Sequence, residues 1–460
     1  MVFPVIGGDG KPTGYEIENS LRFNYADSPR LTKSGTVAGS TTFTFSAWLK
    51  FTIVNNYNFI FCDGNEVGLA KDRTQSGGQF YLNGATGGTY TNSDGFQRDP
   101  SAWYHVVVSC NSGTGIIYVN NDNRKGSINI PQLGNGLSIG SLFPNADYYM
   151  DGYMSEVHFV DGTALNPSSF AETDDNGVWI PKDCKDDLTY GTNGFYLEFK
   201  QSGTSQNSSG MGADTSGNDN HFAVTNLTAT DVTADTPTNN FATMNPVHKS
   251  SYGSAALPTF SEGNLKIGMN SDSSTSSTIA PSKGKWYVEY KQGENTADNG
   301  GYPIVGISAT LGGTAGDVIG FRTPSGSDYR GQLGTTSVSN AFGSARSAND
   351  IFGFYINLDD DILIVHKNGS DYMSSGASSG LNWSGGLTTT NPQTGFYHFY
   401  VQNNQDGSPA YTDEVNFGNP SFSISSGNAD ANGFGNFEYS PTLSGVNYYA
   451  MCTKNLAEYG

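Results

Sequence analysis

The sequence predicts an all-β protein of the sandwich or barrel type, and three observations support this prediction. Of the 460 residues, 59 are Gly, 26 are Tyr and 27 are Phe. Only 14% are charged, against roughly 25% in an average soluble protein. In the most regular runs, apolar and polar residues alternate with a period of two, as in half-buried strands. Turn-forming clusters of Gly, Asn, Asp and Ser separate these runs, and no segment sustains the 3.6-residue period of an amphipathic helix.

The first strand-rich block covers residues 21–180 and follows a leader arm, residues 1–20, that Pro4 interrupts. Further strand candidates in the block follow one another at about 8–12 residues, a spacing typical of sandwiches and barrels. The clearest run, residues 42–52, places five apolar side chains on one face of a strand: Phe43, Phe45, Ala47, Leu49 and Phe51.

A second strand-rich block covers residues 256–425, and its residues 285–291 alternate in the same way. Residues 181–255, rich in Gly, Ser, Thr and Asn, are expected to be a polar connector with one strand at 195–199. Residues 426–460 form a tail rich in Gly, Asn and Tyr. We therefore expect two β domains joined by a polar connector.

The charge balance makes two classes of partner unfavourable. The chain has 23 Lys and Arg against 43 Asp and Glu, a formal net charge of −20. An acidic surface repels phosphates, so we expect no nucleic-acid partner and no anionic membrane surface. The most apolar run, residues 103–110, is far shorter than the roughly 20 residues of a membrane span, so we expect no membrane insertion.

The N-terminal run has no basic residue before it and is broken by Pro4, so we expect no secretory signal peptide. The cysteines Cys62, Cys110, Cys184 and Cys452 have neither disulfide-framework nor metal-site spacing, and we expect single buried thiols. The composition nevertheless resembles that of extracellular proteins. A virus-particle protein, made in a host cytoplasm and active outside after lysis, reconciles these observations.

The first block resembles the laminin-G/concanavalin-A-like jelly roll through the order and spacing of several motifs. This resemblance implies a jelly-roll sandwich over residues 21–180. Ser155 stands where the family commonly has Asp, so no calcium site is carried over to that position. The motifs are Ser20-Leu21-Arg22-Phe23, Phe43-Thr44-Phe45-Ser46-Ala47-Trp48-Leu49, Trp103-Tyr104-His105-Val106-Val107-Val108, Gly115-Ile116-Ile117-Tyr118-Val119-Asn120, Leu137-Ser138-Ile139-Gly140 and the run from Met150 to Phe159.

The second block resembles a SPRY-type domain, which is also a concanavalin-type sandwich. With the first resemblance, it implies two concanavalin-A-like jelly-roll sandwiches in tandem. The matching segments are Gly284-Lys285-Trp286-Tyr287-Val288-Glu289, Ile304-Val305-Gly306-Ile307, Asp350-Ile351-Phe352-Gly353-Phe354, Tyr397-His398-Phe399-Tyr400-Val401 and Val415-Asn416-Phe417-Gly418.

Three segments between the blocks are similar to virion proteins of bacteriophages of marine bacteria, which are tail-fibre-like or structural: 194–199, 214–218 and 236–246. This resemblance implies a protein on the virion surface that is made in the host cytoplasm. Its implied partners are other virion proteins and a host-surface glycan. By analogy with fibres, it also implies a homo-oligomer, specifically a trimer.

Catalytic motifs are missing from the sequence, so we expect a protein that is not an enzyme. Hydrolases of concanavalin-like fold place paired carboxylates on one strand in a Glu-x-Asp-x-x-Glu motif. Glu289 and Glu294 have this outer spacing, but Lys291 stands at the Asp position. No P-loop or HExxH motif is present. A glycoside hydrolase is therefore disfavoured, and the missing signal peptide disfavours a secreted bacterial lectin.

We also expect no cofactor and no metal ligand. Oxygen-rich turns at 214–219 and 359–361 could bind calcium, but acidic residues more often cap tight turns, and neither segment matches an EF-hand loop. Calcium therefore has no support from the sequence.

Aromatic residues on loops are the candidate ligand-binding residues. Aromatic rings stack on the apolar faces of sugars, while amides and carboxylates bind the hydroxyls. The alternative is that each ring packs on the edge of its own sandwich. The candidates are Tyr57, Tyr90, Tyr148, Tyr149, Tyr302, Tyr329 and Trp383.

The preferred function is a non-enzymatic, tail-fibre-like phage adhesin whose jelly-roll loops bind a host-surface glycan or protein. Many copies on one particle would compensate for weak single sites by avidity. The alternative is a purely structural capsid decoration, head-fibre or tail component, whose loops contact only other virion proteins.

Overall fold

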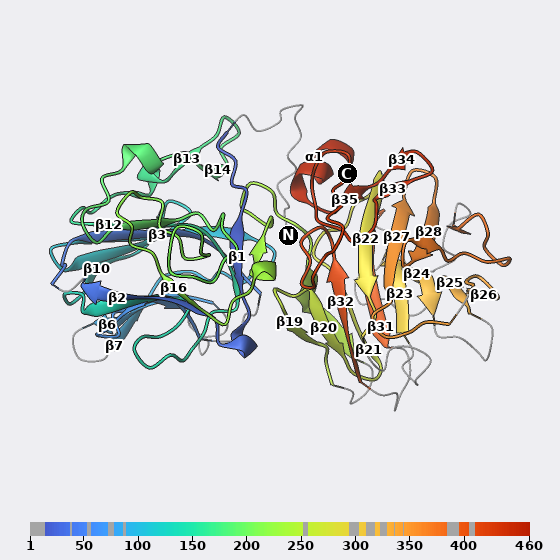
Figure 1. The fold of residues 1–460 in the computed structure, drawn as a ribbon, viewed down its shortest axis with the longest axis horizontal. Helices are drawn as coiled ribbons and strands as arrows, with labels where there is room; N and C mark the ends of the chain where they lie inside the picture. The colour runs from blue at the N-terminus through green and yellow to red at the C-terminus, as the bar shows by residue number, and fades with distance from the viewer. Residues whose placement is uncertain are drawn as a thin grey trace. The chain divides into compact units, whose positions relative to one another are not determined.

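The chain forms two compact units that divide between Asn240 and Phe241, and each consists of facing antiparallel sheets (Figure 1). The predicted leader lies largely outside the described residues, which begin at Gly14. The computed structural model describes residues 14–36, 39–52, 57–71, 78–85, 89–251, 256–293, 303–309, 318–322, 329–334, 336–343, 345–383, 395–403 and 410–460.

The first unit has a large sheet in the order β10-β9-β8-β3-β12-β1-β17, with β15 also paired to β12. These strands are β10 (Asp122–Asn129), β9 (Thr114–Val119), β8 (Trp103–Asn111), β3 (Phe43–Phe51), β12 (Gly152–Asp161), β1 (Ser20–Phe23), β17 (Val232–Thr233) and β15 (Phe195–Leu197). The facing sheet has the order β16-β2-β11-β4-β5-β6-β7. Its strands are β16 (Ala223–Thr225), β2 (Arg30–Thr36), β11 (Asn135–Ile139), β4 (Asn58–Asp63), β5 (Gly68–Lys71), β6 (Phe80–Ala85) and β7 (Thr89–Asn92).

The core of this unit lies between the two sheets, and β3 is its central strand. The five apolar residues expected on one face of β3 are all buried there, as predicted. Phe45 stacks on Phe61 of the facing sheet with ring centroids 4.9 Å apart. The opposite face of β3 is also buried, including Trp48 and Lys50, because later parts of the chain cover it.

Residues 181–240 complete the first unit, which differs from the expected connector with one strand. β15 pairs with β12, β16 pairs with β2 and β17 pairs with β1, so the segment extends both sheets. A buried ion pair anchors its end: Lys50 Nζ lies 2.7 Å from Asp235 Oδ2 and donates to Asn240 Oδ1 at 2.7 Å. Strands of two or three residues have too little length for a period-two pattern, so their position depends on these distant contacts.

The rest of the first unit consists of short elements, of which the β13–β14 hairpin lies over the outer face of the large sheet. The hairpin of β13 (Ala171–Thr173) and β14 (Trp179–Pro181) lies between the 3₁₀ turns η2 (Pro167–Ser169) and η3 (Lys185–Asp187). Two further 3₁₀ turns are η1 (Tyr25–Asp27) and η4 (Ala229–Asp231).

The second unit repeats the plan with one sheet in the order β18-β21-β31-β23-β24-β25-β26. These strands are β18 (Met244–Ser251), β21 (Ser273–Ser277), β31 (His398–Asn403), β23 (Pro303–Ser308), β24 (Val318–Arg322), β25 (Gly331–Leu333) and β26 (Thr336–Val338). Its facing sheet has the order β19-β20-β32-β22-β27-β28-β29, with β30 on β28 and β35 on β22. Its strands are β19 (Thr259–Ser261), β20 (Lys266–Met269), β32 (Tyr411–Asn416), β22 (Lys285–Lys291), β27 (Ile351–Asn357), β28 (Ile362–Lys367), β29 (Ser370–Asp371), β30 (Leu381–Asn382) and β35 (Tyr449–Ala450).

The C-terminal segment packs on this facing sheet instead of forming a separate tail. β35 pairs in parallel with β22, and the helix α1 (Thr453–Tyr459) follows a small hairpin of β33 (Thr442–Leu443) and β34 (Val446–Asn447). Glu289, on the outer face of β22, is fully buried beneath it and accepts the backbone N–H groups of Glu438 at 3.0 Å and Tyr439 at 2.8 Å. In the described part of the chain, no helix is long and apolar enough for a membrane crossing.

Candidate functional site

Of the seven predicted binding residues, the structure brings Tyr57 and Tyr148 into contact, and Tyr149 follows Tyr148 in the chain. The other four are placed differently. Tyr329 and Trp383 belong to the second unit, Tyr302 lies outside the described residues, and Tyr90 lies in β7 with its side chain outside them.

Tyr57 and Tyr148 belong to a group of rings on the outer face of the smaller sheet of the first unit. We call Tyr57, Phe59, Tyr81 and Tyr148 the aromatic surface. The Tyr57 and Tyr148 rings meet edge to face with centroids 5.5 Å apart, and Phe59 lies 6.2 Å from both Tyr148 and Tyr81. Tyr57 also meets Tyr81 edge to face at 6.4 Å. These contacts orient the exposed Tyr148 ring and the half-buried Tyr57 ring against the buried rings of Phe59 and Tyr81.

A bulge in β4 explains why Phe59 contributes to this surface. The register with β5 shifts between Phe59 and Phe61, which breaks the alternation of the strand. As a result, Ile60 and Phe61 both join the core, while Phe59 packs on the outer face with Cys62. Sequence reasoning missed Phe59 and Tyr81 because it assigned strand aromatics to the core, and a bulge leaves no clear signal in a run of apolar residues.

Tyr148 is held in place by the loop that connects β11 to β12. Its backbone has φ +50°, a left-handed conformation that is unusual for a bulky residue and costs of order 1 kcal/mol. The Tyr148 N–H donates to Asp147 Oδ1 at 2.7 Å, and its carbonyl accepts the Phe59 N–H at 3.0 Å. These bonds hold the backbone of Tyr148, which is 40% exposed, while the contacts with Tyr57 and Phe59 orient its ring.

Polar groups border the aromatic surface on the same loop. Asn145 and Asp147 are exposed, and Asn145 Nδ2 donates to Glu66 Oε1 at 2.8 Å. Tyr149 is half-buried, donates its hydroxyl to the Ala146 carbonyl at 2.5 Å and contacts the Tyr25 ring at 6.2 Å. Rings next to amide and carboxylate groups match the chemistry that a sugar needs.

Trp383 and Tyr329 pack on the core of the second unit and not on a ligand-facing loop. Trp383 is 4% exposed and lies directly after β30, whose pairing with β28 brings it under the sheet. Its ring contacts Tyr397 at 5.9 Å. Tyr329 is half-buried against the same core. For these two residues, the packing alternative describes the observed position.

A buried group of titratable side chains lies under the β13–β14 hairpin in the first unit. His158 stacks on Tyr196 with centroids 4.1 Å apart, and its Nδ1 is 3.0 Å from the Tyr190 hydroxyl. Its Nε2 faces both Cys184 Sγ at 3.9 Å and Glu156 Oε2 at 3.8 Å. Burial lowers the pKa of His158, but the Cys184 sulfur and the Glu156 carboxylate outweigh burial and raise it to about 9. Because all of these side chains are buried, the group holds the covering segment and offers no surface to a ligand.

The oxygen-rich turn at 214–219 uses its first carboxylate as a cap. Asp214 accepts backbone N–H groups from Tyr196 at 2.9 Å, Ser216 at 2.9 Å and Asn220 at 2.8 Å. Within the residues that the structure describes, no group of three or more His, Cys, Asp or Glu is arranged to hold a metal ion.

A family model and several solved structures match parts of the chain. Residues 24–169 match a laminin-G family model described as the concanavalin A-like lectin/glucanases superfamily. The chain is similar to a candidate carbohydrate-binding protein from Bacteroides ovatus, with 19% identity over 33% of this chain and a TM-score of 0.29. The aligned region spans less than half of the Bacteroides protein, 45% of its length.

Two further solved structures are similar to parts of the chain. A heptameric pentraxin from Limulus polyphemus has 18% identity over 33% of this chain and 80% of its own, with a TM-score of 0.27. The SPRY domain of human HERC1 has 9% identity over 37% of this chain and 96% of its own, with a TM-score of 0.26. A search of curated protein sequences found no match. Together with the observed sheets, the family match identifies a nearly all-β protein with sandwich sheets and, at residues 24–169, a concanavalin-like domain.

Proposed function

We propose that this protein is a non-enzymatic adhesin of a phage particle that binds a host-surface glycan on the aromatic surface of its first unit. The observation that carries the proposal is Tyr148, an exposed tyrosine held in a left-handed backbone conformation with its ring edge-on to Tyr57. Backbone strain of this kind persists where the surroundings over-determine it, and it is often found at ligand-binding sites.

The chemistry of the aromatic surface favours a neutral sugar. The apolar face of a hexose can stack on the Tyr148 ring, while Asn145 and Asp147 on the same loop offer a donor and an acceptor to its hydroxyls. A ring contact contributes only about 0.5–1.5 kcal/mol beyond the burial of its area. Single sites are therefore expected to be weak, and several copies on one particle would gain by avidity.

The particle setting rests on sequence features. Three segments of the chain resemble phage virion proteins, and the polar, weakly charged composition suits a surface protein. We accordingly propose a homo-oligomer, a trimer by analogy with fibres, that is made in the host cytoplasm and displayed on the virion with other virion proteins as partners.

A glycan array tests this proposal. The purified chain is applied to immobilised neutral oligosaccharides of glucose, galactose, mannose and arabinose and, in parallel, to host cells. Tyr148→Asn removes the ring while keeping a residue that tolerates a left-handed backbone, so we expect it to lose at least about tenfold in apparent affinity with an unchanged melting temperature.

The matched control is Phe396→Ala, which removes a ring that is 52% exposed in the second unit and should bind like the unmodified protein. If Tyr148→Asn retains full binding, the aromatic surface is not the site. If the chain ignores both the glycans and the cells but docks on assembled particles in electron micrographs, the purely structural role replaces the adhesin.

A further inference from the structure

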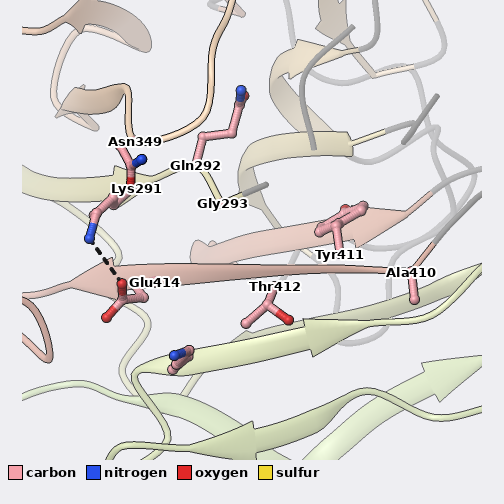
Figure 2. Close-up of a pocket in the computed structure, with 9 residues that line it drawn as sticks. Lys291, Gln292, Gly293, Asn349, Ala410, Tyr411, Thr412 and Glu414 are labelled. Atoms are coloured by element: carbon pink, nitrogen blue, oxygen red, sulfur yellow. Dashed lines mark hydrogen bonds and ion pairs between the residues drawn. The ribbon is translucent and has the colours of Figure 1, made fainter. Parts of the chain in front are cut away.

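A polar pocket of about 430 Å³ lies on the second unit, where β20, β32 and β22 run side by side (Figure 2). Its volume falls within the range of small-molecule sites. Figure 2 shows Lys291 and Glu414 joined across neighbouring strands, with Thr412 further along the strand of Glu414. The lining residues are Lys266, Lys291, Gln292, Gly293, Asn349, Ala410, Tyr411, Thr412 and Glu414.

The strand register sets a row of three charges across this face. Glu414 on β32 is the direct partner of Lys266 on β20 and also of Lys291 on β22. Their neighbours Ile267, Val415 and Tyr290 belong to the core, so the alternation of each strand places the charged residues on the outer face. One carboxylate therefore lies between two ammonium groups.

Each oxygen of the Glu414 carboxylate has a partner within the protein, whereas one of the two lysines has no ion pair among the described residues. Glu414 Oε1 lies 3.2 Å from Lys291 Nζ, and Glu414 Oε2 accepts the Ser421 hydroxyl at 2.8 Å. Lys266 makes no ion pair within the described residues. The pocket thus keeps an excess of one positive charge in a chain whose formal net charge is −20.

Neutral hydrogen-bonding groups surround the charges. Thr412 and Asn349 are exposed and line the pocket. Gly293 lets the two strands approach closely, because a Cβ at this position would lie 1.7 Å from the Thr412 carbonyl oxygen.

We propose that the pocket binds one carboxylate-bearing sugar, a hexuronate-like unit of an acidic glycan. Its carboxylate would pair with Lys266, and its hydroxyls would donate to Glu414 and bind Thr412 and Asn349. An acidic peptide fits less well, because it would bring negative charge to Glu414 without hydroxyl donors. A neutral sugar would leave Lys266 without a counter-charge. This site is separate from the aromatic surface and does not depend on the function proposed for it.

Calorimetric titration of the full chain with trigalacturonate tests the proposal, with maltotriose as the neutral comparison. We expect binding of trigalacturonate only. Lys266→Gln should weaken it by about tenfold, since a hydrogen bond to a charged group is lost, and Lys266→Arg should restore most of the affinity. Thr412→Val should weaken binding by a smaller factor.

The matched control is Lys283→Gln, which removes the same charge from an exposed position of the same unit and should leave the affinity unchanged. Tyr148→Asn should also have no effect, so the failure of one site is distinguishable from the failure of the other. Equal binding by Lys266→Gln and the unmodified protein, with both folded by thermal unfolding, overturns the proposal. Absence of trigalacturonate binding, or equal binding of maltotriose, overturns it as well.

Discussion

Both units complete their sandwiches with a later segment of chain, but the buried charge that holds the segment differs. In the first unit, Lys50 and Asp235 are fully buried and form an ion pair of 2.7 Å. In the second unit, Glu289 is equally buried, but within the described part of the chain its hydrogen-bond donors are all uncharged: the N–H groups of Glu438 and Tyr439, the Asn416 amide and the Tyr287 hydroxyl.

The two units therefore stabilise a buried charge in different ways. In the first unit, an opposite charge compensates the free-energy cost of removing the charge from water. In the second unit, hydrogen bonds from uncharged groups compensate part of this cost. Burial, only partly opposed by these hydrogen bonds, raises the pKa of Glu289 to about 7. The free energy of unfolding of the second unit should therefore depend on pH near neutrality through Glu289.

The largest expected effect comes from breaking the buried ion pair. Lys50→Ala leaves Asp235 buried without its cation, and we expect the free energy of unfolding of the first unit to fall by about 3–5 kcal/mol. Urea unfolding followed by tryptophan fluorescence measures this change.

The control is Lys285→Ala, which removes a partly exposed ion pair of 2.9 Å with Asp359 in the second unit. Exposed pairs contribute about 0–1 kcal/mol, so this loss should be small. Similar losses of unfolding free energy in the two variants would contradict this prediction, because burial would then not increase the contribution of the Lys50 pair.

The second expected effect is a pH dependence of the second unit. The folded pKa of Glu289 lies above its ordinary value of 4.5, so the folded state binds more protons than the unfolded state between about pH 4.5 and 7. Stability from this group is present at the acid end and decreases as pH rises to 7, by up to about 3 kcal/mol.

Glu289→Gln should remove this contribution, which unfolding free energies at pH 5 and pH 7.5 would reveal as a smaller difference between the two conditions. Parallel pH profiles for Glu289→Gln and the unmodified protein would contradict the prediction. An equal pH response in Lys50→Ala and the unmodified protein serves as the control, because that variant keeps Glu289.

The smallest expected effect distinguishes the two proposed binding sites by salt. Raising NaCl from ~0.05 to ~0.5 M shortens the Debye length and screens the Lys266 charge, so trigalacturonate binding should weaken several-fold. Neutral-glycan binding at the aromatic surface should change by less than about twofold, because ring stacking is insensitive to screening. Equal weakening by salt at both sites would contradict the assignment of a charged ligand to the pocket and a neutral ligand to the aromatic surface.

Much of the fold could be predicted from alternation in long strands. The predicted apolar face of 43–51 and the residues Trp286, Val288 and Tyr290 of 285–291 lie in the two cores as expected, since a period of two over seven or more residues places every second side chain on one face. The short strands of 195–233 could not be predicted in this way, because their pairing depends on free sheet edges supplied by distant residues.

The candidate sites were only partly predictable. Loop position and residue type selected Tyr57 and Tyr148, whose rings the structure brings into contact, but the same criteria also selected Trp383, which follows a short strand and is buried in the core. The row formed by Lys266, Glu414 and Lys291 left no sequence signal, because Glu414 is more than a hundred residues from both lysines and meets them only through strand register.

Local alternation and turn residues are enough to predict the β class, the two principal strand-rich blocks and the apolar faces of the long strands. They do not predict which later segments complete each sandwich, which charges are buried or which side chains meet at the aromatic surface and the pocket. Register and burial depend on contacts between residues distant along the chain, and local patterns do not encode those contacts.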